Sequence, residues 1–346
     1  MTVIERLQDR GFRRYGSPAR GFRYRARHGA PVNGAHAGRI RHLAIPPGWT
    51  DVFVSPSPTS AVQAIGRDRA GRWQYRYSEA QTLRRERKKR ERLLAFLRAL
   101  PAVRSRVARD LRSEGLSRER VLAATVRLLL RGFLRPGSQV YARENGTYGL
   151  TTLKPRHVKI RGPRITLAYP GKGGKAQVRE IDDAPAARVV AALLAEPGVQ
   201  VFRFRADSGE WVDVRRRHVN AYLREIGGCR ITAKDFRTWA GTLVGACALA
   251  RIGYPAEASK AAVRRHVAQA MQETAERLGN TPAVCRNSYV SPEVLAAFAK
   301  GRVLADAPAP ETLVGGSTKA LERVERRLAR RIANGTDGLS VARRAA

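Results

Sequence analysis

Several residue types are scarce in this chain of 346 residues, and each scarcity narrows the class of protein. The 3 cysteines, Cys229, Cys247 and Cys285, are odd in number and widely spaced. Such spacing does not fit a disulfide framework or a zinc site, so we expect a reducing compartment and small buried thiols. The 6 histidines show no metal-ligand spacing either. Nothing in the sequence asks for a metal or another cofactor.

Long apolar runs are scarce as well. No stretch approaches the roughly 18 to 20 apolar residues needed to span a bilayer. The first residues, Met1–Arg6, have no apolar region of the kind found in signal peptides. We therefore expect a cytoplasmic protein that does not cross a membrane.

Negative charge is scarce relative to positive charge. Lys and Arg number 66 against 29 Asp and Glu, which gives a formal net charge of +37. A surface this positive attracts polyanions, so nucleic acid is the expected partner, and an anionic membrane surface is the competing interpretation. A length of 346 residues allows two domains with cores of their own.

Residues 1–82 are rich in Gly, Pro, Arg and aromatic residues, with only short apolar runs. Gly21–Arg25 alternates rings with charges, as a half-exposed strand does, and Asp51–Val54 and Gln74–Tyr77 follow a similar pattern. The sequence therefore predicts a small, mostly antiparallel β domain over residues 1–82.

The composition changes in the next segment. Arg84–Arg92 holds seven cations and two acids in nine residues. We predict a helix that starts near Thr82 and, over residues 83–92, a basic hinge between the domains. Two interpretations of this charge remain open: a solvated basic helix, or a strap that lies along a phosphate backbone.

Residues 93–304 are predicted to form a larger, mainly helical domain with a small β-sheet, so the fold class is α+β. Helical periodicity runs from Pro101 to about Arg131, and helices resume from Pro185. Four short strands are predicted between them: Gln139–Arg143, Val158–Ile160, Arg164–Ala168 and Gln177–Ile181.

The end of this domain has a clear helix signal. Residues 259–278 place apolar side chains on one face, and Gly279 follows where a helix C-cap sits. Residues 305–346 are predicted to be a linker followed by a basic, amphipathic C-terminal tail.

Tyr289 is the candidate nucleophile. A phenol with a pKa of about 10 reacts poorly at neutral pH, so it needs nearby cations that favour phenolate and hold an anionic target. The alternative is that Tyr289 is a half-buried packing residue. Lys234 and Arg237 are three residues apart and so share one face of a helix, and the start of that helix has the capping-box spacing of Thr232 and Asp235. Four segments hold candidate phosphate ligands: Arg135-Pro-Gly137, Gly171-Lys172, Lys234-Asp-Phe-Arg237 and Gly279-Asn280.

These four segments, followed by Tyr289, occur in an order that resembles the type IB DNA topoisomerases, particularly their poxvirus-like and bacterial branch. The resemblance runs from roughly residue 20 to residue 300 and includes three further segments. They are Arg135-x-Gly-x-x-x-Tyr141, Glu144–Lys154, and Gly66–Tyr77 with its Gln74-Tyr75-x-Tyr77 end.

The resemblance implies five catalytic residues: Arg135, Lys172, Arg237, Asn280 and Tyr289. Tyr289 would form a 3′-phosphotyrosyl link, the two arginines and Asn280 would hold the phosphate oxygens, and Lys172 would be the general acid. Poxvirus enzymes have His where Asn280 stands, and Asn donates a hydrogen bond but cannot carry a proton. If the His contributes more than a hydrogen bond, this enzyme is somewhat slower.

The resemblance also implies the setting of the reaction. We expect a monomer that closes as a clamp around duplex DNA, works without ATP or metal, and associates with the nucleoid. The expected DNA contacts are Arg72, Gln74, Tyr75, Tyr77, Tyr141 and Lys234. For Tyr75 and Tyr77 sheet packing stays open, because alternation along a strand would place one ring toward the core and the other toward DNA.

Two alternative functions are a tyrosine recombinase and a non-catalytic architectural DNA binder. A tyrosine recombinase usually has His two residues before the second Arg and Gly-His before the Tyr, whereas this chain has Asp235 and Gly279-Asn280. A non-catalytic architectural DNA binder would be expected to have lost the Tyr or the Arg residues, and none is lost.

Overall fold

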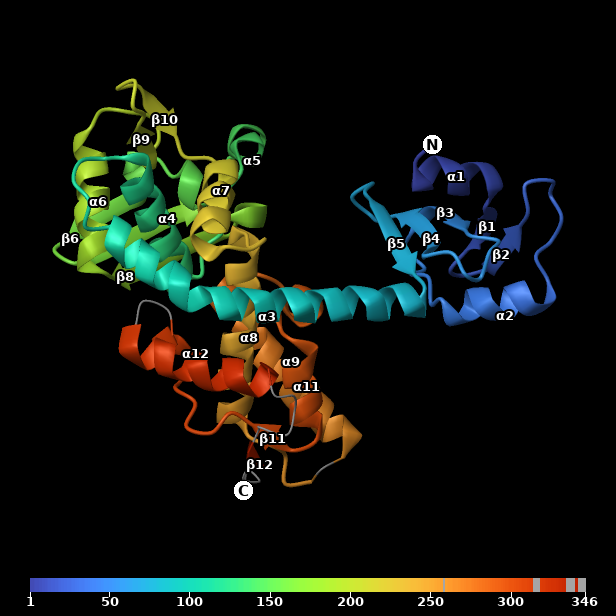
Figure 1. Cartoon of the computed structure of the whole chain (residues 1–346). Helices are drawn as coiled ribbons and strands as arrows, with labels where there is room; N and C mark the ends of the chain where they lie inside the picture. Colours follow the sequence, from blue (N-terminus) through green and yellow to red (C-terminus); the bar gives the residue numbers. More distant parts are fainter. Residues whose placement is uncertain (258, 314–317, 334–339, 342–346) are drawn as a thin grey trace. The chain divides into compact units, whose positions relative to one another are not determined.

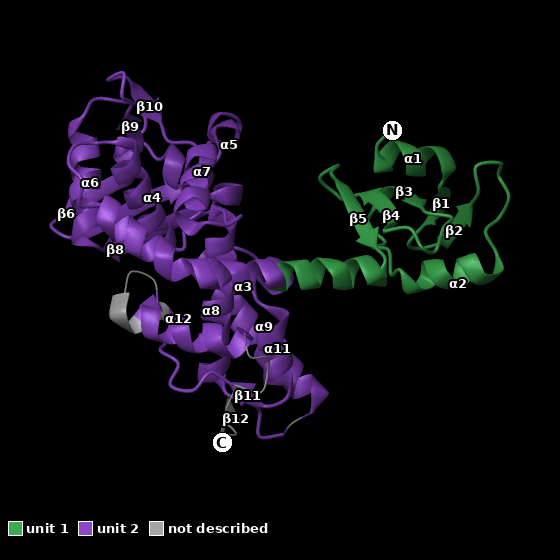
Figure 2. Cartoon of the chain, in the orientation of Figure 1, with its two compact units in different colours: residues 1–90 green, residues 91–346 purple. Residues whose placement is uncertain are grey.

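The computed structural model describes residues 1–257, 259–313, 318–333 and 340–341 (Figure 1). The chain divides into two compact units, residues 1–90 and residues 91–346 (Figure 2). The boundary falls inside helix α3 (Glu79–Asp110), so the predicted hinge at residues 83–92 is helical throughout.

Unit 1 is built on a five-stranded antiparallel sheet with the strand order β2-β1-β3-β4-β5. Its strands are β1 (Phe12–Ser17), β2 (Gly21–Arg25), β3 (Thr50–Val54), β4 (Val62–Arg67) and β5 (Trp73–Tyr77). The predicted antiparallel β domain is therefore confirmed, and all three predicted strands are present.

Two helices of unit 1 were not predicted: α1 (Val3–Arg10) and α2 (Gly34–His42). Leu7 of α1 packs with Phe53 and Ile65, whereas Ile40 of α2 packs with a cluster that includes Val52. Neighbouring residues of a strand point to opposite faces. The two helices thus cover opposite faces of the sheet.

Unit 2 is mainly helical. Its further helices of eight residues or more are α4 (Arg118–Gly132), α6 (Ala184–Ala195), α7 (Arg216–Gly227), α8 (Ala233–Ile252), α9 (Lys260–Leu278), α11 (Pro292–Ala299) and α12 (Thr318–Ala333). The short turns are α5 (Gln139–Glu144), α10 (Pro282–Val284), η1 (Leu150–Thr152), η2 (Pro155–His157), η3 (Lys172–Gly174), η4 (Cys285–Tyr289) and η5 (Pro310–Leu313).

The helical periodicity predicted from Pro101 to about Arg131 belongs to two helices. Helix α3 continues through Pro101, because its buried stripe of Phe96, Leu100, Val103 and Val107 runs unbroken across the proline. The chain turns only after Asp110, and α4 begins behind the N-cap Ser117.

The predicted small β-sheet of unit 2 is confirmed as the antiparallel order β6-β7-β8. The strands are β6 (Val158–Arg161), β7 (Arg164–Pro170) and β8 (Ala176–Asp182), with the two-stranded pairs β9 (Arg203–Arg205) with β10 (Trp211–Asp213) and β11 (Arg302–Val303) with β12 (Ser340–Val341). The strand predicted at residues 139–143 is wrong, because these residues form the short helix α5. Ala142 N donates to Ser138 O at 3.0 Å, which is a helical bond, and no strand among the described residues pairs with the segment.

Helix α8 is the central helix of unit 2. From Ala233 to Leu249 every residue except Lys234 is buried. A helix with small and apolar residues on all sides is suited to the middle of a core. Its capping box is present as predicted, with Thr232 as N-cap and Asp235 as the third helical residue.

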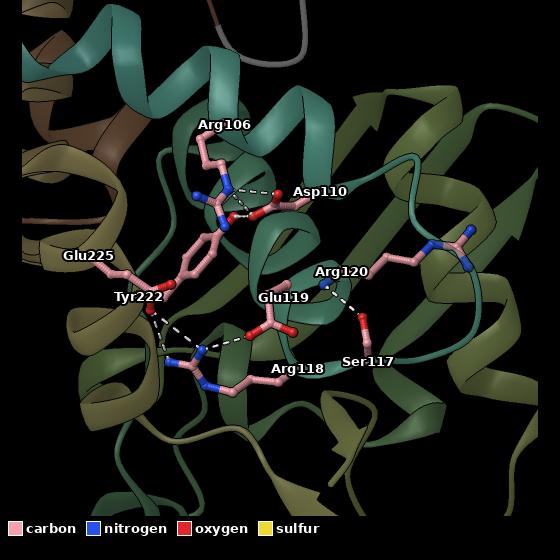
Figure 3. A network of polar contacts seen from close by, with 8 residues as sticks. All are labelled: Arg106, Asp110, Ser117, Arg118, Glu119, Arg120, Tyr222 and Glu225. Carbon is pink, nitrogen blue, oxygen red and sulfur yellow. Dashed lines mark hydrogen bonds and ion pairs between the residues drawn. The ribbon is translucent and has the colours of Figure 1, made fainter. Parts of the chain in front are cut away.

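A network of polar contacts ties the end of α3 to α4 and α7 (Figure 3). The hydroxyl of the fully buried Tyr222 donates to Asp110 Oδ2 at 2.7 Å, and Arg106 Nε donates to the same carboxylate at 2.8 Å. Burial and the bond to Asp110 raise the pKa of Tyr222. Arg118 pairs with Glu225 at 3.4 Å on the more exposed side.

Helix α12 continues the core beyond residue 300. Its amphipathic stripe was predicted, and four of its side chains are buried: Leu321, Val324, Leu328 and Ile332. Part of the predicted linker forms the short turn η5, and the predicted basic end of the tail falls largely on residues 334–339 and 342–346, outside the described residues.

Candidate active site

Arg237 lies in the first turns of α8 and is 4 % exposed. Its Nη1 donates to Phe133 O at 2.5 Å and its Nη2 to Leu278 O at 2.8 Å. Burial lowers the pKa of Arg237 to about 10, and the positive charge of Arg135 acts in the same direction. The guanidinium therefore stays charged at neutral pH and is fixed in place by two backbone carbonyls.

Asn280 follows α9, as predicted. Gly279 has the left-handed φ of 62° that a helix C-cap requires, and Asn280 N donates to Ala275 O at 2.9 Å. A Cβ on Gly279 would lie 2.5 Å from Gln177 Oε1. Glycine is therefore needed both for the turn and for the close approach of strand β8.

Arg135 is half-buried in the loop after α4. Its Nη2 donates to Gly279 O at 3.1 Å and also to Asn280 Oδ1. The loop passes very close to another glycine, because a Cβ on Gly149 would lie 2.6 Å from Gly137 Cα. The loop after α4 and the segment that begins at Glu144 therefore cross at these two glycines.

Tyr289 ends the π-helical turn η4, where Val290 N donates to Cys285 O at 2.9 Å. It is half-buried, and its ring centroid is 5.4 Å from Arg237 Cζ. Its carbonyl accepts from Thr242 Oγ1 at 3.0 Å, and α8 comes so close that a Cβ on Gly241 would lie 2.6 Å from Tyr289 Cβ. Helix α8 therefore carries Arg237 and also supports Tyr289.

Two enclosed donors in this cluster make no hydrogen bond among the described residues: Arg237 Nε and Asn280 Nδ2. Buried donors are normally satisfied, so each exception needs an explanation. Three cationic or amide groups beside one phenol would suit an anion with several oxygens, such as a phosphodiester. The arrangement fits the transfer of a phosphoryl group to Tyr289.

Lys172 is exposed at the turn of the β7–β8 hairpin, as predicted. Within the described ranges its amine makes no hydrogen bond or ion pair. The neighbouring Gly173 and Gly174 both have φ of 74°. The amine is therefore not part of the cluster around Arg237 and would join it only by moving on its long side chain.

Three residues beside the cluster were missed by the sequence analysis: Tyr169, Gln177 and Arg179. With Arg135 and Arg237 they line one small pocket. Arg179 Nη2 donates to Arg277 O at 2.8 Å, and burial lowers the pKa of Arg179. A usable signal existed, because Gln177 and Arg179 alternate in step with the fully buried Ile181 and so are polar residues on an inward face.

The proposed DNA contacts of unit 1 lie around the β4–β5 turn. Asp68 organises this turn by accepting from Arg72 Nε at 3.0 Å and from Gln74 Nε2 at 2.9 Å. Hydrogen bonds from Arg72 lower the pKa of Asp68 to about 2. Gln74 lies on the opposite sheet face from Tyr75 because the two are adjacent in a strand.

The expectation that Tyr75 and Tyr77 point to opposite faces is wrong. They are two residues apart and therefore share one face, where their rings stack with centroids 6.1 Å apart. Tyr75 is 37 % exposed, Tyr77 is half-buried, and Arg85 Cζ lies 4.3 Å from the Tyr77 ring centroid. Both rings are thus on a partly exposed, positively charged face.

Two predicted contacts of unit 2 lie apart from the buried cluster. Lys234 is exposed although Arg237, three residues on, is buried. Tyr141 is 59 % exposed on α5 rather than in a strand. Both side chains face solvent.

The described residues contain no group of three or more His, Cys, Asp or Glu side chains placed to hold a metal ion. None of the helices in this part of the chain is long and apolar enough to span a membrane.

The fold and the cluster define a class of basic, two-unit proteins with an arginine-flanked tyrosine, and comparison with known families agrees. Residues 78–300 match the family described as eukaryotic DNA topoisomerase I, catalytic core, and residues 21–68 match bacterial DNA topoisomerase IB, N-terminal domain. The chain belongs to the type IB DNA topoisomerases, which are enzymes of the isomerase class.

Two relatives illustrate the similarity. The DNA topoisomerase 1B of Acanthamoeba polyphaga mimivirus is 34% identical over 257 residues, which cover 73% of this chain and 76% of the viral protein. The DNA topoisomerase 1B of vaccinia virus (strain Copenhagen) is 22% identical over 264 residues, which cover 74% of this chain and 80% of that protein.

Proposed function

We propose that this chain relaxes supercoiled duplex DNA by cutting one strand through Tyr289, letting the cut strand rotate, and rejoining it. The observation that carries the proposal is the convergence of Arg135, Arg237, Asn280 and Tyr289 from four separate segments. Within the described part of the chain, Arg237 and Asn280 each keep one enclosed donor without a hydrogen-bond partner, which supports a site for phosphate oxygens.

The chemistry follows from charge. The Tyr289 hydroxyl gives its proton to water as its oxygen attacks the phosphorus of a backbone phosphodiester, a 3′-phosphotyrosyl bond forms, and the bond to the 5′ oxygen breaks. Negative charge grows on the nonbridging oxygens, where the guanidinium groups of Arg135 and Arg237 stabilise it with Asn280 as a neutral donor. Removing one such donor costs about 2.7 to 4 kcal/mol of transition-state stabilisation in other enzymes.

The leaving 5′ oxygen needs a proton, and Lys172 is the proposed general acid. Its exposed place on a Gly-rich hairpin turn lets the amine reach DNA that lies over the cluster. Religation reverses each step: the 5′ hydroxyl attacks the phosphotyrosine, and the proton returns to Lys172. One phosphoester replaces another of similar energy, so the cycle needs no ATP.

The remaining proposals concern the substrate and setting. Unit 1 and unit 2 hold the duplex between them as a clamp, and a single copy of the chain performs the reaction in the cytoplasm on nucleoid DNA. Arg72, Gln74, Tyr75, Tyr77, Tyr141 and Lys234 are proposed to contact the duplex, mostly at phosphate and sugar. Support comes from the net charge of +37 and from the exposed or half-buried state of these side chains.

The test is relaxation of negatively supercoiled plasmid in EDTA without ATP, beside a Tyr289→Phe variant. We expect the parent to relax the plasmid and to leave a covalent protein–DNA complex when detergent stops the reaction. We expect Tyr289→Phe to bind DNA without doing either. Equal relaxation by both proteins would show that Tyr289 is not the nucleophile.

Relaxation by neither protein, with both bound to the plasmid, would overturn the proposed activity. Identifying which DNA end is attached to the protein also tests the polarity of the covalent link. A blocked 3′ end supports the proposed link, whereas a blocked 5′ end contradicts it.

A further inference from the structure

Helix α12 lies outside residues 78–300, the part of the chain that matches the catalytic core of the family. It nevertheless contacts the helix that carries Arg237. Trp239 Nε1 on α8 donates to Glu325 Oε1 on α12 at 2.8 Å. Trp239 is 1 % exposed and Glu325 is 3 % exposed, so this bond lies deep in unit 2.

Glu325 also accepts a hydrogen bond from Arg104 Nη2 on α3. One carboxylate therefore joins three helices, α3, α8 and α12. Two other contacts hold α8 against α3: Arg92 Nε donates to Asp235 at 2.6 Å, and the rings of Phe96 and Phe236 meet edge to face at 4.9 Å. Glu325 adds a directional bond from α12 to these contacts, beside the apolar side chains of α12 that join the same core.

Stability alone does not account for a carboxylate at this position. The other side chains of the buried stripe of α12 are apolar, and burial raises the pKa of Glu325, while Arg104 and Trp239 lower it. Replacing a buried ion pair by well-packed apolar residues is often neutral or stabilising. What a directional bond adds is a fixed orientation of the partner helix, and the partner here is α8.

The orientation of α8 matters because one side of the helix contacts α12 and the other side carries Arg237 and supports Tyr289. Residues two apart on a helix differ by about 200° in direction, so Trp239 points away from Arg237. Residues four apart lie on one side, which places Gly241 beside Arg237 and against Tyr289. A rotation of α8 about its axis would move Arg237 and the support of Tyr289 together.

We propose that Glu325 is a positioning residue for the cleavage chemistry, because its bond to Trp239 fixes the rotation of α8 and thereby the place of Arg237 relative to Tyr289. This inference rests on the proposed function. It assigns a part in the reaction to a helix that lies beyond the family-matched core.

The test compares Glu325→Leu, Glu325→Gln and Trp239→Phe with the parent. The control is Glu322→Gln, one turn earlier on α12. Glu322 pairs with Arg326 at 3.8 Å and with Arg104 at 3.9 Å but, among the described residues, makes no bond to Trp239, so this variant disturbs the Arg104 side of the network and keeps the Trp239 bond. The rate of nicking is measured with enzyme in excess over supercoiled plasmid, with detergent used to trap the covalent complex. The DNA dissociation constant and the Tm are measured for each protein.

We expect Glu325→Leu and Trp239→Phe to nick about 10- to 100-fold more slowly, as small misplacements of catalytic groups do. The dissociation constant should stay near the parental value. The Tm of Glu325→Leu should fall, because Trp239 Nε1 and Arg104 lose a buried acceptor, so the rates are compared at a temperature where every variant is folded. Glu325→Gln keeps an acceptor for Trp239 and should recover much of the rate. Glu322→Gln should match the parent.

Several outcomes would overturn the inference. These are a parental rate in Glu325→Leu or Trp239→Phe, or a rate loss that Glu322→Gln shares. If Glu325→Leu fails to fold, Trp239→Phe decides alone. Failure of the parent to nick, or nicking by Tyr289→Phe, points instead to the proposed function and overturns both proposals.

Discussion

Arg135 donates a hydrogen bond to the side-chain oxygen of Asn280. The same nitrogen donates to Gly279 O at 3.1 Å, so the arginine fixes both the turn and the amide that follows it. With its oxygen held by Arg135, Asn280 directs its Nδ2 the other way, and this enclosed donor makes no hydrogen bond to any residue that the structure describes. The bond therefore decides which end of the amide a phosphate would meet.

Asn280 variants test this assignment. Asn280→Ala removes the free donor and should lower the nicking rate about 100- to 1,000-fold, with DNA affinity nearly unchanged. Asn280→Asp should be slower still, because a carboxylate beside the phosphate adds repulsion. Asn280→His restores a donor and should keep most of the activity. A rate for Asn280→Asp above that of Asn280→Ala would contradict the donor role.

Lys172→Ala tests the general acid. The variant should cleave ordinary DNA about 100- to 10,000-fold more slowly. A substrate with sulfur in place of the bridging 5′ oxygen should restore the rate, because a thiolate leaves without a proton. The control is Lys175→Ala, on the same hairpin, which should behave like the parent with both substrates. Equal defects of Lys172→Ala on the two substrates would show that Lys172 does not protonate the leaving group.

Gly241→Ala tests the support of Tyr289. The new Cβ would lie 2.6 Å from Tyr289 Cβ, so the tyrosine must move. We expect nicking to slow about 10- to 100-fold, although Ala favours a helix by about 1 kcal/mol over Gly. The matched control is Gly245→Ala, one turn later, where the closest atom is Val290 Cγ2 at 3.1 Å and only a small loss is expected. Similar rates in the two variants would argue against the contact.

Tyr222→Phe tests the buried polar network. The variant leaves the Asp110 carboxylate with one fewer donor and should reduce the free energy of unfolding by about 1 to 3 kcal/mol. Relaxation by the folded protein should not change. Tyr254→Phe is the control, because within the described residues the Tyr254 hydroxyl makes no hydrogen bond. Denaturant unfolding of both variants measures the difference, and an unchanged midpoint in Tyr222→Phe would contradict the prediction.

Asp68 gives the prediction for pH. Its folded pKa is depressed from 3.8 to about 2, so its contribution to stability is present above about pH 4 and is lost as pH falls toward 2. NMR titration of the carboxyl carbon should show the low midpoint in the parent. Arg72→Ala should move that midpoint upward, because the Arg72 side chain is the largest cause of the shift. Arg69→Ala should leave it unchanged.

The local signals that the sequence carries best are caps and turns. The α9 helix ends at Gly279 as predicted, and the Thr232–Asp235 capping box opens α8. These features depend on a few neighbouring residues, so periodicity and propensity suffice to find them. The strands on both sides of Lys172 were found for the same reason.

The errors concern features that the rest of the fold decides. Val140 and Tyr141 favour strands by composition, yet no partner strand among the described residues lies beside them and they form α5. The helical pattern predicted from Pro101 to about Arg131 belongs to two helices, because the buried stripe continues α3 past Pro101 to Asp110. The bond from Trp239 to Glu325 joins residues 86 positions apart, so no local sequence pattern could predict it.

The buried stripe of α12 has a practical consequence for choosing where to cut the gene. A fragment that stops at residue 300 contains every residue proposed for catalysis, and family boundaries would recommend it. Such a fragment would lack Leu321, Val324, Leu328 and Ile332 and would expose the apolar core residues that these side chains cover. It would also leave the Trp239 indole without its hydrogen-bond acceptor. For expression, crystallisation or inhibitor screening, the smallest sound version of this enzyme therefore extends through residue 333.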